Sequence, residues 1–185
     1  LLQAIAAVTA REQAFARARA GYPGDVTATP DKLGAIDAAA AAFREAGIAY
    51  ALIGGVAVGL RSGVPRATLD VDFAIPTTAD REATTTALAA HGFRRTGVFA
   101  HRMNYVHGSG EPLQVAFDPA FDPMIARAER MPFGAEGVFV VTREDLLAMK
   151  RRAAADPARR RSKALRDQAD IALLEGDVPD PDEGW

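Results

Sequence analysis

The stretch that decides the fold is Leu52-Ile53-Gly54-Gly55, followed after a short gap by Leu69-Asp70-Val71-Asp72-Phe73. The first piece is an apolar run that ends in two glycines, which predicts a buried strand breaking into a turn. The second piece belongs to a predicted strand over residues 68–75, where period 2 places Asp70 and Asp72 on one face. The other face, directed to the core, carries Leu69, Val71, Phe73 and Ile75.

Two carboxylates projecting side by side repel each other, and a divalent cation with oxygen ligands relieves that repulsion. Hard Mg²⁺ or Mn²⁺ fits Asp70 and Asp72 best, although a polar strand edge facing solvent would also explain them. Gly54 and Gly55 lead into a predicted short helix, so backbone N–H groups there could receive a phosphate. A simple tight turn is the alternative for these glycines.

The remaining segments predict an α+β fold, a mixed β-sheet with flanking helices and a C-terminal helical segment. Apolar spacing, capping residues and turn signals give the expected elements. Helices are expected over residues 1–20, 31–47, 54–61, 77–91, 122–130, 142–154 and 157–174, and further strands over 50–53, 93–97, 99–106, 112–117 and 138–141. We divide the chain into an N-terminal helix and loop (1–30), a core (31–142), the helical segment (143–175) and an acidic tail (176–185).

The composition is that of an ordinary globular protein, with 49% hydrophobic and 25% charged residues among 185. The net charge of −2 means that any nucleic-acid contact must come from a local basic patch. The absence of cysteine excludes disulfides and thiolate zinc sites. No apolar run is long enough to span a membrane, so we expect a cytoplasmic protein. The first residue, Leu1, is not methionine, which allows for residues upstream.

The composite of apolar strand, Gly-Gly, short helix and Asp-x-Asp strand resembles the polymerase β-like nucleotidyltransferase superfamily. The fuller string from Gly54 through Asp72 is most similar to the AbiEii-type toxins of type IV toxin–antitoxin systems. Two C-terminal pieces extend the resemblance over roughly residues 33–175: Glu144-Asp145-Leu146-Leu147-Ala148-Met149-Lys150 and Lys163-Ala164-Leu165-Arg166-Asp167-Gln168-Ala169-Asp170-Ile171. The resemblance implies a nucleotidyltransferase-fold sheet and a catalytic Mg²⁺ or Mn²⁺ with an NTP as substrate.

By this resemblance, Asp70 and Asp72 hold the metal, and Gly54 and Gly55 seat the triphosphate. Lys150 lies on the apolar stripe of its predicted helix, where it either snorkels to the surface or reaches an anion in a cleft. The resemblance implies a triphosphate contact for Lys150.

Three further charged residues have two interpretations each. Arg66, just before the acidic strand, could contact phosphate or pair with Asp70. Asp167 and Asp170, at i,i+3, could make surface ion pairs with Lys163 and Arg166. The resemblance implies instead that at least one of the two faces the active site, with Asp167 favoured.

The third carboxylate of the superfamily has no clear counterpart. In Leu113-Gln114-Val115-Ala116-Phe117 the corresponding position is Gln114, and a neutral amide is a weaker metal ligand than a carboxylate. Asp118, on the same strand face, or Glu111, at the other end, could substitute for it. This departure from the superfamily pattern bears on activity and not on fold.

The resemblance implies transfer of NMP to RNA, at the 3′ end of tRNA, by a toxin with a cognate antitoxin protein. The basic segment between Arg151 and Arg166 suits an RNA acceptor, although a solvated helix face would look the same. Two alternatives stay open. One is a nucleotidyltransferase for a small, antibiotic-type acceptor, consistent with the negative net charge, and the other is a degenerate nucleotide-binding regulatory module, suggested by Gln114.

Overall fold

The computed structural model describes residues 1–8, 10 and 31–178. Within these, residues 2–8 are helical. The other helices are α2 (Lys32–Glu45), α3 (Gly54–Ser62), α4 (Arg81–Ala90), α5 (Asp122–Ala126), α6 (Arg143–Ala155) and α7 (Arg161–Glu175), with a 3-10 turn η1 (Pro119–Phe121). The strands are β1 (Ala51–Ile53), β2 (Val71–Ala74), β3 (Phe93–Phe99), β4 (Arg102–His107), β5 (Pro112–Ala116), β6 (Glu129–Met131) and β7 (Val138–Val140).

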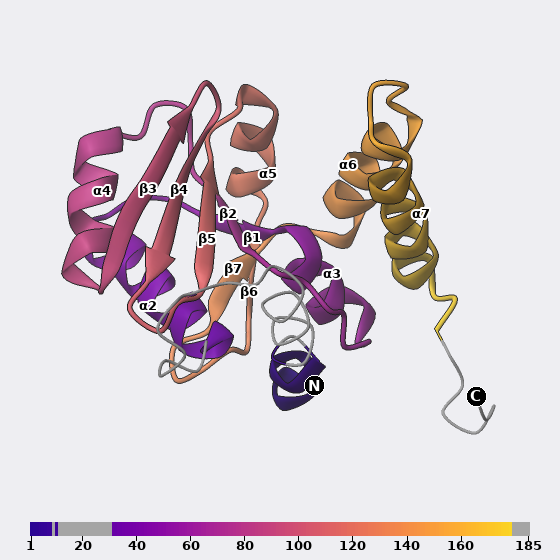
Figure 1. Ribbon diagram of the computed structural model, residues 1–185, viewed down its shortest axis with the longest axis horizontal. Coiled ribbons are helices and arrows are strands. Elements are labelled where there is room, and N and C mark those ends of the chain that lie inside the picture. Colours follow the sequence, from indigo (N-terminus) through magenta and orange to yellow (C-terminus); the bar gives the residue numbers. More distant parts are fainter. Residues whose placement is uncertain (9, 11–30, 179–185) are drawn as a thin grey trace, which may run out of the picture.

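The strands form one mixed sheet in the order β3-β4-β5-β2-β1-β7-β6 (Figure 1). β2 pairs in parallel with β5 and antiparallel with β1, and β1 pairs in parallel with β7. Helices flank this sheet, while α6 and α7 pack on each other beside it and reach the sheet mainly through α3. The predicted α+β class, with a mixed sheet and a C-terminal helical segment, is confirmed. The strand that carries Asp72 lies at the centre of the sheet.

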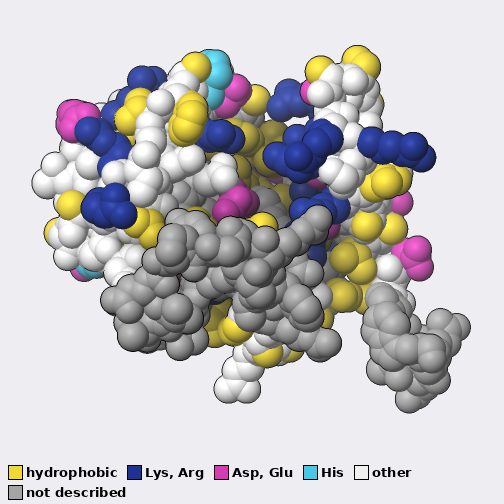
Figure 2. Space-filling view, viewed as in Figure 1, with side chains coloured by type: hydrophobic (Ala, Val, Ile, Leu, Met, Phe, Trp, Pro, Cys, Tyr) yellow, Lys and Arg dark blue, Asp and Glu magenta, His cyan; other side chains and the backbone are white. Residues whose placement is uncertain are grey.

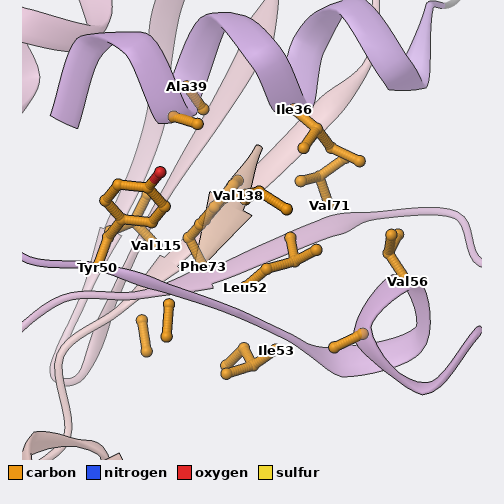
Figure 3. Close-up of a cluster of buried hydrophobic side chains, with 14 of the residues drawn as sticks. Ile36, Ala39, Tyr50, Leu52, Ile53, Val56, Val71, Phe73, Val115 and Val138 are labelled. Atoms are coloured by element: carbon orange, nitrogen blue, oxygen red, sulfur yellow. The ribbon is translucent and has the colours of Figure 1, made fainter. Parts of the chain in front are cut away.

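The core lies between the sheet and α2. Ile36 and Ala39 of α2 face Leu52, Val71 and other apolar side chains of the central strands (Figure 3). Small alanines on the buried side of α2 allow the helix to approach the sheet closely, as close packing requires. α2 begins where the sequence predicts, because the Asp31 side chain accepts a hydrogen bond from Gly34 N–H at 2.9 Å.

The acidic strand is shorter than predicted. β2 begins at Val71 rather than Thr68, and its ladder to β5 begins at the same residue. Before it, Thr68 Oγ1 donates to the carbonyl of Asp70 at 3.2 Å, and Lys32 Nζ donates to the carbonyl of Leu69 at 3.3 Å. Leu69 is therefore 42% exposed rather than part of the core. Local hydrogen bonding at these residues replaces the strand ladder.

Other boundaries also differ. α4 begins at Arg81 because Asp80 caps it, whereas Thr77 binds Asp122 through both its N–H and its hydroxyl. β3 continues to Phe99, so the strand predicted from Phe99 begins only at Arg102. The helix predicted over 122–130 ends at Ala126 and is followed by β6, and the helix predicted from Pro157 begins at Arg161.

The predicted helix over residues 1–20 is described only in part, and the predicted loop before Pro30 and most of the acidic tail lie outside the described residues. Ile5, in the described part, is completely buried against the core. In the part of the chain that the structure describes, no helix has the length and apolar character needed to cross a membrane.

Candidate active site

Asp72 lies on the central strand of the sheet, and Asp70 lies immediately before that strand. Asp72 stands in register with Ile53 of β1 on one side and with Gln114 of β5 on the other, and Asp70 lies just before β2. Both residues are half-buried. Burial and the neighbouring Asp70 charge raise the pKa of Asp72 to about 6. Lys150, Lys32 and Arg66 lower that pKa, but they do not offset the other two effects.

The glycine turn packs directly against these carboxylates. α3 begins at Gly54, and no side chain caps its N-terminus. Gly54 has a φ of +72°, and a Cβ there would lie 2.2 Å from Asp72 Oδ2. A Cβ on Gly55 would lie 2.5 Å from Arg66 Nη1. Both glycines are therefore needed for close approach, and they bring the helix N-terminus between the Asp72 carboxylate and the Arg66 guanidinium.

Five charged side chains form an ion cluster next to this turn. Lys150 Nζ lies 3.0 Å from Asp167 Oδ1 and 2.7 Å from Asp170 Oδ2. Arg159 Nε donates to Asp167 Oδ2 at 2.6 Å, and Arg66 Nε pairs with Asp170 Oδ1. The ion cluster thus joins α6, α7 and the loop before β2, and it reaches Gly55 through Arg66.

Burial makes this ion cluster different from a surface network. The side chains of Asp167 and Asp170 are only 3% and 1% exposed. Burial tends to raise the pKa of Asp167, but hydrogen bonds from Arg159 and Lys150 outweigh it and hold the pKa below its ordinary value. The alternative interpretation, surface pairs with Lys163 and Arg166, does not hold, because Asp167 and Asp170 pair with Lys150, Arg159 and Arg66 instead.

The possible pairing of Arg66 with Asp70 is also wrong, because Arg66 binds Asp170 instead. Lys150 does not snorkel to the surface, since its side chain is only 14% exposed. The structure therefore brings Lys150, Asp167, Asp170 and Arg66 together beside the glycine turn.

The position next to Asp72 on β5 is occupied by an amide. Gln114 Nε2 donates to Asp70 Oδ2 at 3.0 Å. Asp118 follows β5 and caps η1, accepting from Ala120 N–H at 2.9 Å. Glu111 does not substitute, because it shares the face of the core residue Leu113 and pairs there with Lys32, and both charged side chains are buried. Among the described residues, no group of three or more His, Cys, Asp or Glu side chains could hold a metal.

A cleft of about 490 Å³ opens over Asp72 and both of its register partners, Ile53 and Gln114. Its floor comes from the central strands, and its walls come from the β3–β4 hairpin, η1 and α6. It is lined by Ile53, Asp72, Phe73, Phe99, Ala100, His101, Arg102, Gln114, Ala116, Asp118, Phe121 and Arg152. Figure 2 shows Lys and Arg side chains gathered around the hollow between the sheet and the C-terminal helices.

Several residues of this region escape prediction from sequence. Lys32 and Glu111 meet only through the pairing of distant elements, and no local pattern marks them. Arg159 belongs to the basic segment but turns toward Asp167, whereas Arg152, Arg160 and their neighbours remain exposed. The aromatic and basic residues of the hairpin become significant only because the fold brings them to the cleft.

The carboxylates fit one divalent cation. Asp70 and Asp72 offer hard oxygen ligands, and burial together with the Asp70 charge raises the pKa of Asp72, which are conditions that a bound cation would relieve. Because Gly54 has no side chain, Asp72 Oδ2 can lie close to the backbone at the start of α3, where a Cβ would clash with it. A glutamine amide can also turn its carbonyl oxygen toward a cation, although it adds no charge.

The fold is shared with known nucleotidyltransferases. The solution structure of the antibiotic-resistance factor ANT(2'')-Ia is similar with a TM-score of 0.59 and 18% identity, covering 79% of this chain and 85% of that chain. An antigenic nucleotidyltransferase-like protein from Paracoccidioides brasiliensis has a TM-score of 0.55 and 24% identity, covering 83% and 80%. The Megavirus polyadenylate synthase has a TM-score of 0.57 and 14% identity, covering 93% and 37%. At these identities the likeness shows the fold alone.

A family model gives the more specific result. The model described as nucleotidyl transferase AbiEii toxin, Type IV TA system, matches residues 38–183. This match includes the glycine turn, the acidic strand and the ion cluster, which are the regions that carry the resemblance in the sequence. No curated protein sequence matches the chain.

Proposed function

Because the chain belongs to the AbiEii family of nucleotidyltransferase toxins, we propose that it transfers NMP from an NTP to RNA, at the 3′ end of tRNA. In this proposal it is the toxin of a toxin–antitoxin pair and acts in the cytoplasm, where tRNA is found. The observation that carries the proposal is the position of Asp70 and Asp72 between the glycine turn and a cleft bordered by arginines. An anionic nucleotide and an anionic acceptor can meet there.

The glycine turn and the ion cluster would bind the triphosphate. The uncapped N-terminus of α3 presents free backbone N–H groups, which favour an anion. Arg66 and Lys150 lie beside it, and Asp167 and Asp170 hold them in place. A bound phosphate would share these two cations with the aspartates, since both arginine and lysine can donate to several oxygens at once.

Asp70 and Asp72 would hold Mg²⁺ or Mn²⁺, which neutralises charge on the phosphate oxygens when bound. In the transfer, the acceptor hydroxyl oxygen bonds to the α-phosphorus as its proton leaves to water. The bond from the α-phosphorus to the bridging oxygen breaks, and pyrophosphate leaves with the electron pair. Gln114 would keep Asp70 oriented through the bond to its Oδ2.

The direct test is to incubate the purified protein with Mg²⁺, total tRNA and each of the four α-labelled NTPs. We expect label in tRNA with at least one NTP, none after EDTA, and none with Asp72→Ala. If no NTP labels tRNA at any Mg²⁺ concentration, the proposed acceptor is wrong.

The same reactions, repeated with small hydroxyl compounds such as aminoglycosides in place of tRNA, test the small-acceptor alternative. Label in those compounds, and none in tRNA, would favour an activity like that of the antibiotic-resistance factor that shares the fold.

One observation favours a second candidate function, a regulatory module that binds nucleotide without catalysis. Gln114 gives the carboxylate pair a neutral neighbour where a third charge would strengthen metal binding. Such a module would bind NTP and release no pyrophosphate, and Asp70→Ala would have no consequence in cells. Expression tests separate the two functions: a toxin slows growth, and Asp72→Ala relieves the effect. Equal toxicity of that variant would contradict catalysis as its cause.

A further inference from the structure

The β3–β4 hairpin places an exposed aromatic ring on the wall of the cleft. Phe99 is 49% exposed, although its neighbours in the cleft include Asp72 and Gln114. The Arg102 guanidinium lies over the Phe99 ring, 4.7 Å from its centroid. A half-exposed phenylalanine with a stacked arginine is a flat, cationic surface, which suits a planar group carrying negative charge nearby.

This surface is held in place by the surrounding strands. Phe99 and Arg102 are direct partners across the hairpin, and only Ala100 and His101 connect them. The carbonyl of His101 accepts a hydrogen bond from Phe117 N–H at 3.0 Å, which ties the hairpin tip to the end of β5. A Cβ on Gly97 would lie 3.0 Å from Phe99 Cε2, so the ring rests where Gly97 lacks a side chain. Little side-chain freedom remains to be lost when a ligand stacks.

The geometry of the proposed transfer indicates which substrate binds this surface. In an in-line displacement, the attacking hydroxyl and the leaving pyrophosphate lie on opposite sides of the α-phosphorus. The proposed triphosphate site comprises Gly55, Arg66 and Lys150, and none of these three lines the cleft. The pyrophosphate therefore leaves on the ion-cluster side of Asp72, and the acceptor must enter through the cleft.

The charge of the cleft rim fits a polyanionic acceptor. Arg102 on the hairpin and Arg152 on α6 line opposite walls, and both are exposed. Arg160, just before α7, is exposed as well. Such arginines neutralise backbone phosphates without reading sequence, while exposed aromatic rings stack on unpaired bases.

We propose that Phe99 and Arg102 bind the acceptor by stacking the last unpaired base of a single-stranded RNA 3′ end, with Arg152 contacting its backbone. This site rests on the proposed function, because the in-line argument needs the triphosphate beside the ion cluster. It directs the terminal ribose toward Asp72 and Gln114 at the floor of the cleft.

Kinetics of three variants test this acceptor site. Base stacking on one aromatic ring corresponds to about a 5- to 150-fold effect, so Phe99→Ala should lower kcat/KM for tRNA within that range. The KM for NTP should stay unchanged, and Phe99→Trp should retain activity because it keeps a ring. Val98→Ala is the matched control, since Val98 is 58% exposed on the same strand but does not line the cleft.

Fluorescence tests the site even without turnover. Trp185 is the single tryptophan of the chain, so Phe99→Trp in a Trp185→Phe background reports on the hairpin alone. We expect a short single-stranded RNA to quench this indole, and NTP with Mg²⁺ to leave it unchanged. Quenching by NTP alone would assign the surface to the nucleotide base and overturn the proposal, as would the absence of quenching by RNA.

The two tests also separate this site from the proposed function. If the wild-type protein labels tRNA and Phe99→Ala behaves like Val98→Ala, the acceptor site is wrong and the function stands. If no tRNA is labelled, the proposed function fails, and the RNA quenching experiment alone decides whether the hairpin binds RNA.

Discussion

Gln114 donates its side-chain amide to Asp70 Oδ2 at 3.0 Å, while its backbone stands in register with Asp72 on the neighbouring strand. One residue therefore contacts one carboxylate and adjoins the other, without adding a negative charge to the pair. We expect the affinity for a divalent cation and the stability of the metal-free protein to depend on this neutrality, and each can be measured.

Gln114→Glu should strengthen metal binding. A third carboxylate adds charge to a set of hard oxygen ligands. We therefore expect the Mg²⁺ concentration that gives half of the maximal thermal stabilisation to fall roughly tenfold. The same variant should melt at a lower temperature in EDTA, because three carboxylates then repel one another. Thermal melts with and without Mg²⁺ measure both effects, with Gln114→Ala as the control for loss of the amide. An unchanged Mg²⁺ dependence would contradict this role of position 114.

Asp72→Asn should stabilise the metal-free protein at high pH. Burial and Asp70 raise the pKa of Asp72 from 3.8 to about 6, so the folded state binds the proton more tightly than the unfolded state. The contribution of protonated Asp72 to the free energy of unfolding is fully present below about pH 4 and is lost as the pH rises through about 6. The loss is roughly 3 kcal/mol at about 1.4 kcal/mol per pKa unit.

Chemical denaturation in EDTA at pH 5 and pH 8 checks this prediction. The advantage of Asp72→Asn over the wild type should be larger at pH 8. An equal difference at both pH values would show that the charge of Asp72 is not the cause. Mg²⁺ should remove the advantage, because it stabilises only the protein that retains both carboxylates.

Asp170→Asn should destabilise the fold strongly. Asp170 is the shared partner of Arg66 and Lys150 and is almost completely buried, so its neutralisation leaves Arg66 without its carboxylate partner and Lys150 with Asp167 alone. Breaking a buried ion pair in this way costs about 3–5 kcal/mol. Glu175→Gln is the control, because its pair with Arg151 is exposed and is worth at most about 1 kcal/mol. Equal denaturation midpoints for the two variants would contradict the importance of the ion cluster.

Gly54→Ala and Gly47→Ala separate backbone strain from contact with the carboxylate. Both glycines have positive φ, of +72° and +67°, so each substitution costs roughly 1–2 kcal/mol in the left-handed region. Only at Gly54 would the new Cβ meet Asp72 Oδ2, whereas nothing lies within 4 Å at Gly47. We expect Gly54→Ala alone to weaken Mg²⁺-dependent stabilisation and to abolish transfer. Comparable Mg²⁺ responses in both variants would refute the contact.

The sequence is most informative where its signal is local. Asp31 caps α2, and the run before Gly54 forms β1, because capping and strand-to-turn patterns depend on adjacent residues. Burial of Lys150 agrees with its place on the apolar stripe of its helix. Gln114 lies beside Asp72 on the neighbouring strand, which agrees with its expected position as the counterpart of the superfamily's third carboxylate.

The parts that sequence could not provide depend on distant partners. Leu69 alternates with the core residues in sequence, but Lys32, from α2, binds its carbonyl and the strand begins later. Lys163 lies four positions before Asp167 and could pair with it on the helix surface, but Lys150 and Arg159 reach Asp167 from outside its helix instead. Tertiary contacts override the local pattern in both cases.

The residues of the ion cluster lie far apart in the sequence, and this separation has a consequence for protein synthesis. Arg66 and its partner Asp170 are separated by 104 positions, and the glycine turn precedes both. During translation, the central strands leave the ribosome long before α7 does. Until α7 follows, Arg66 and Lys150 lack the carboxylates that hold them beside Gly55, so a nascent chain carries its acidic pair in an incomplete site. If the ion cluster binds the triphosphate as proposed, we expect a nascent chain to gain transfer activity only after α7 has left the ribosome.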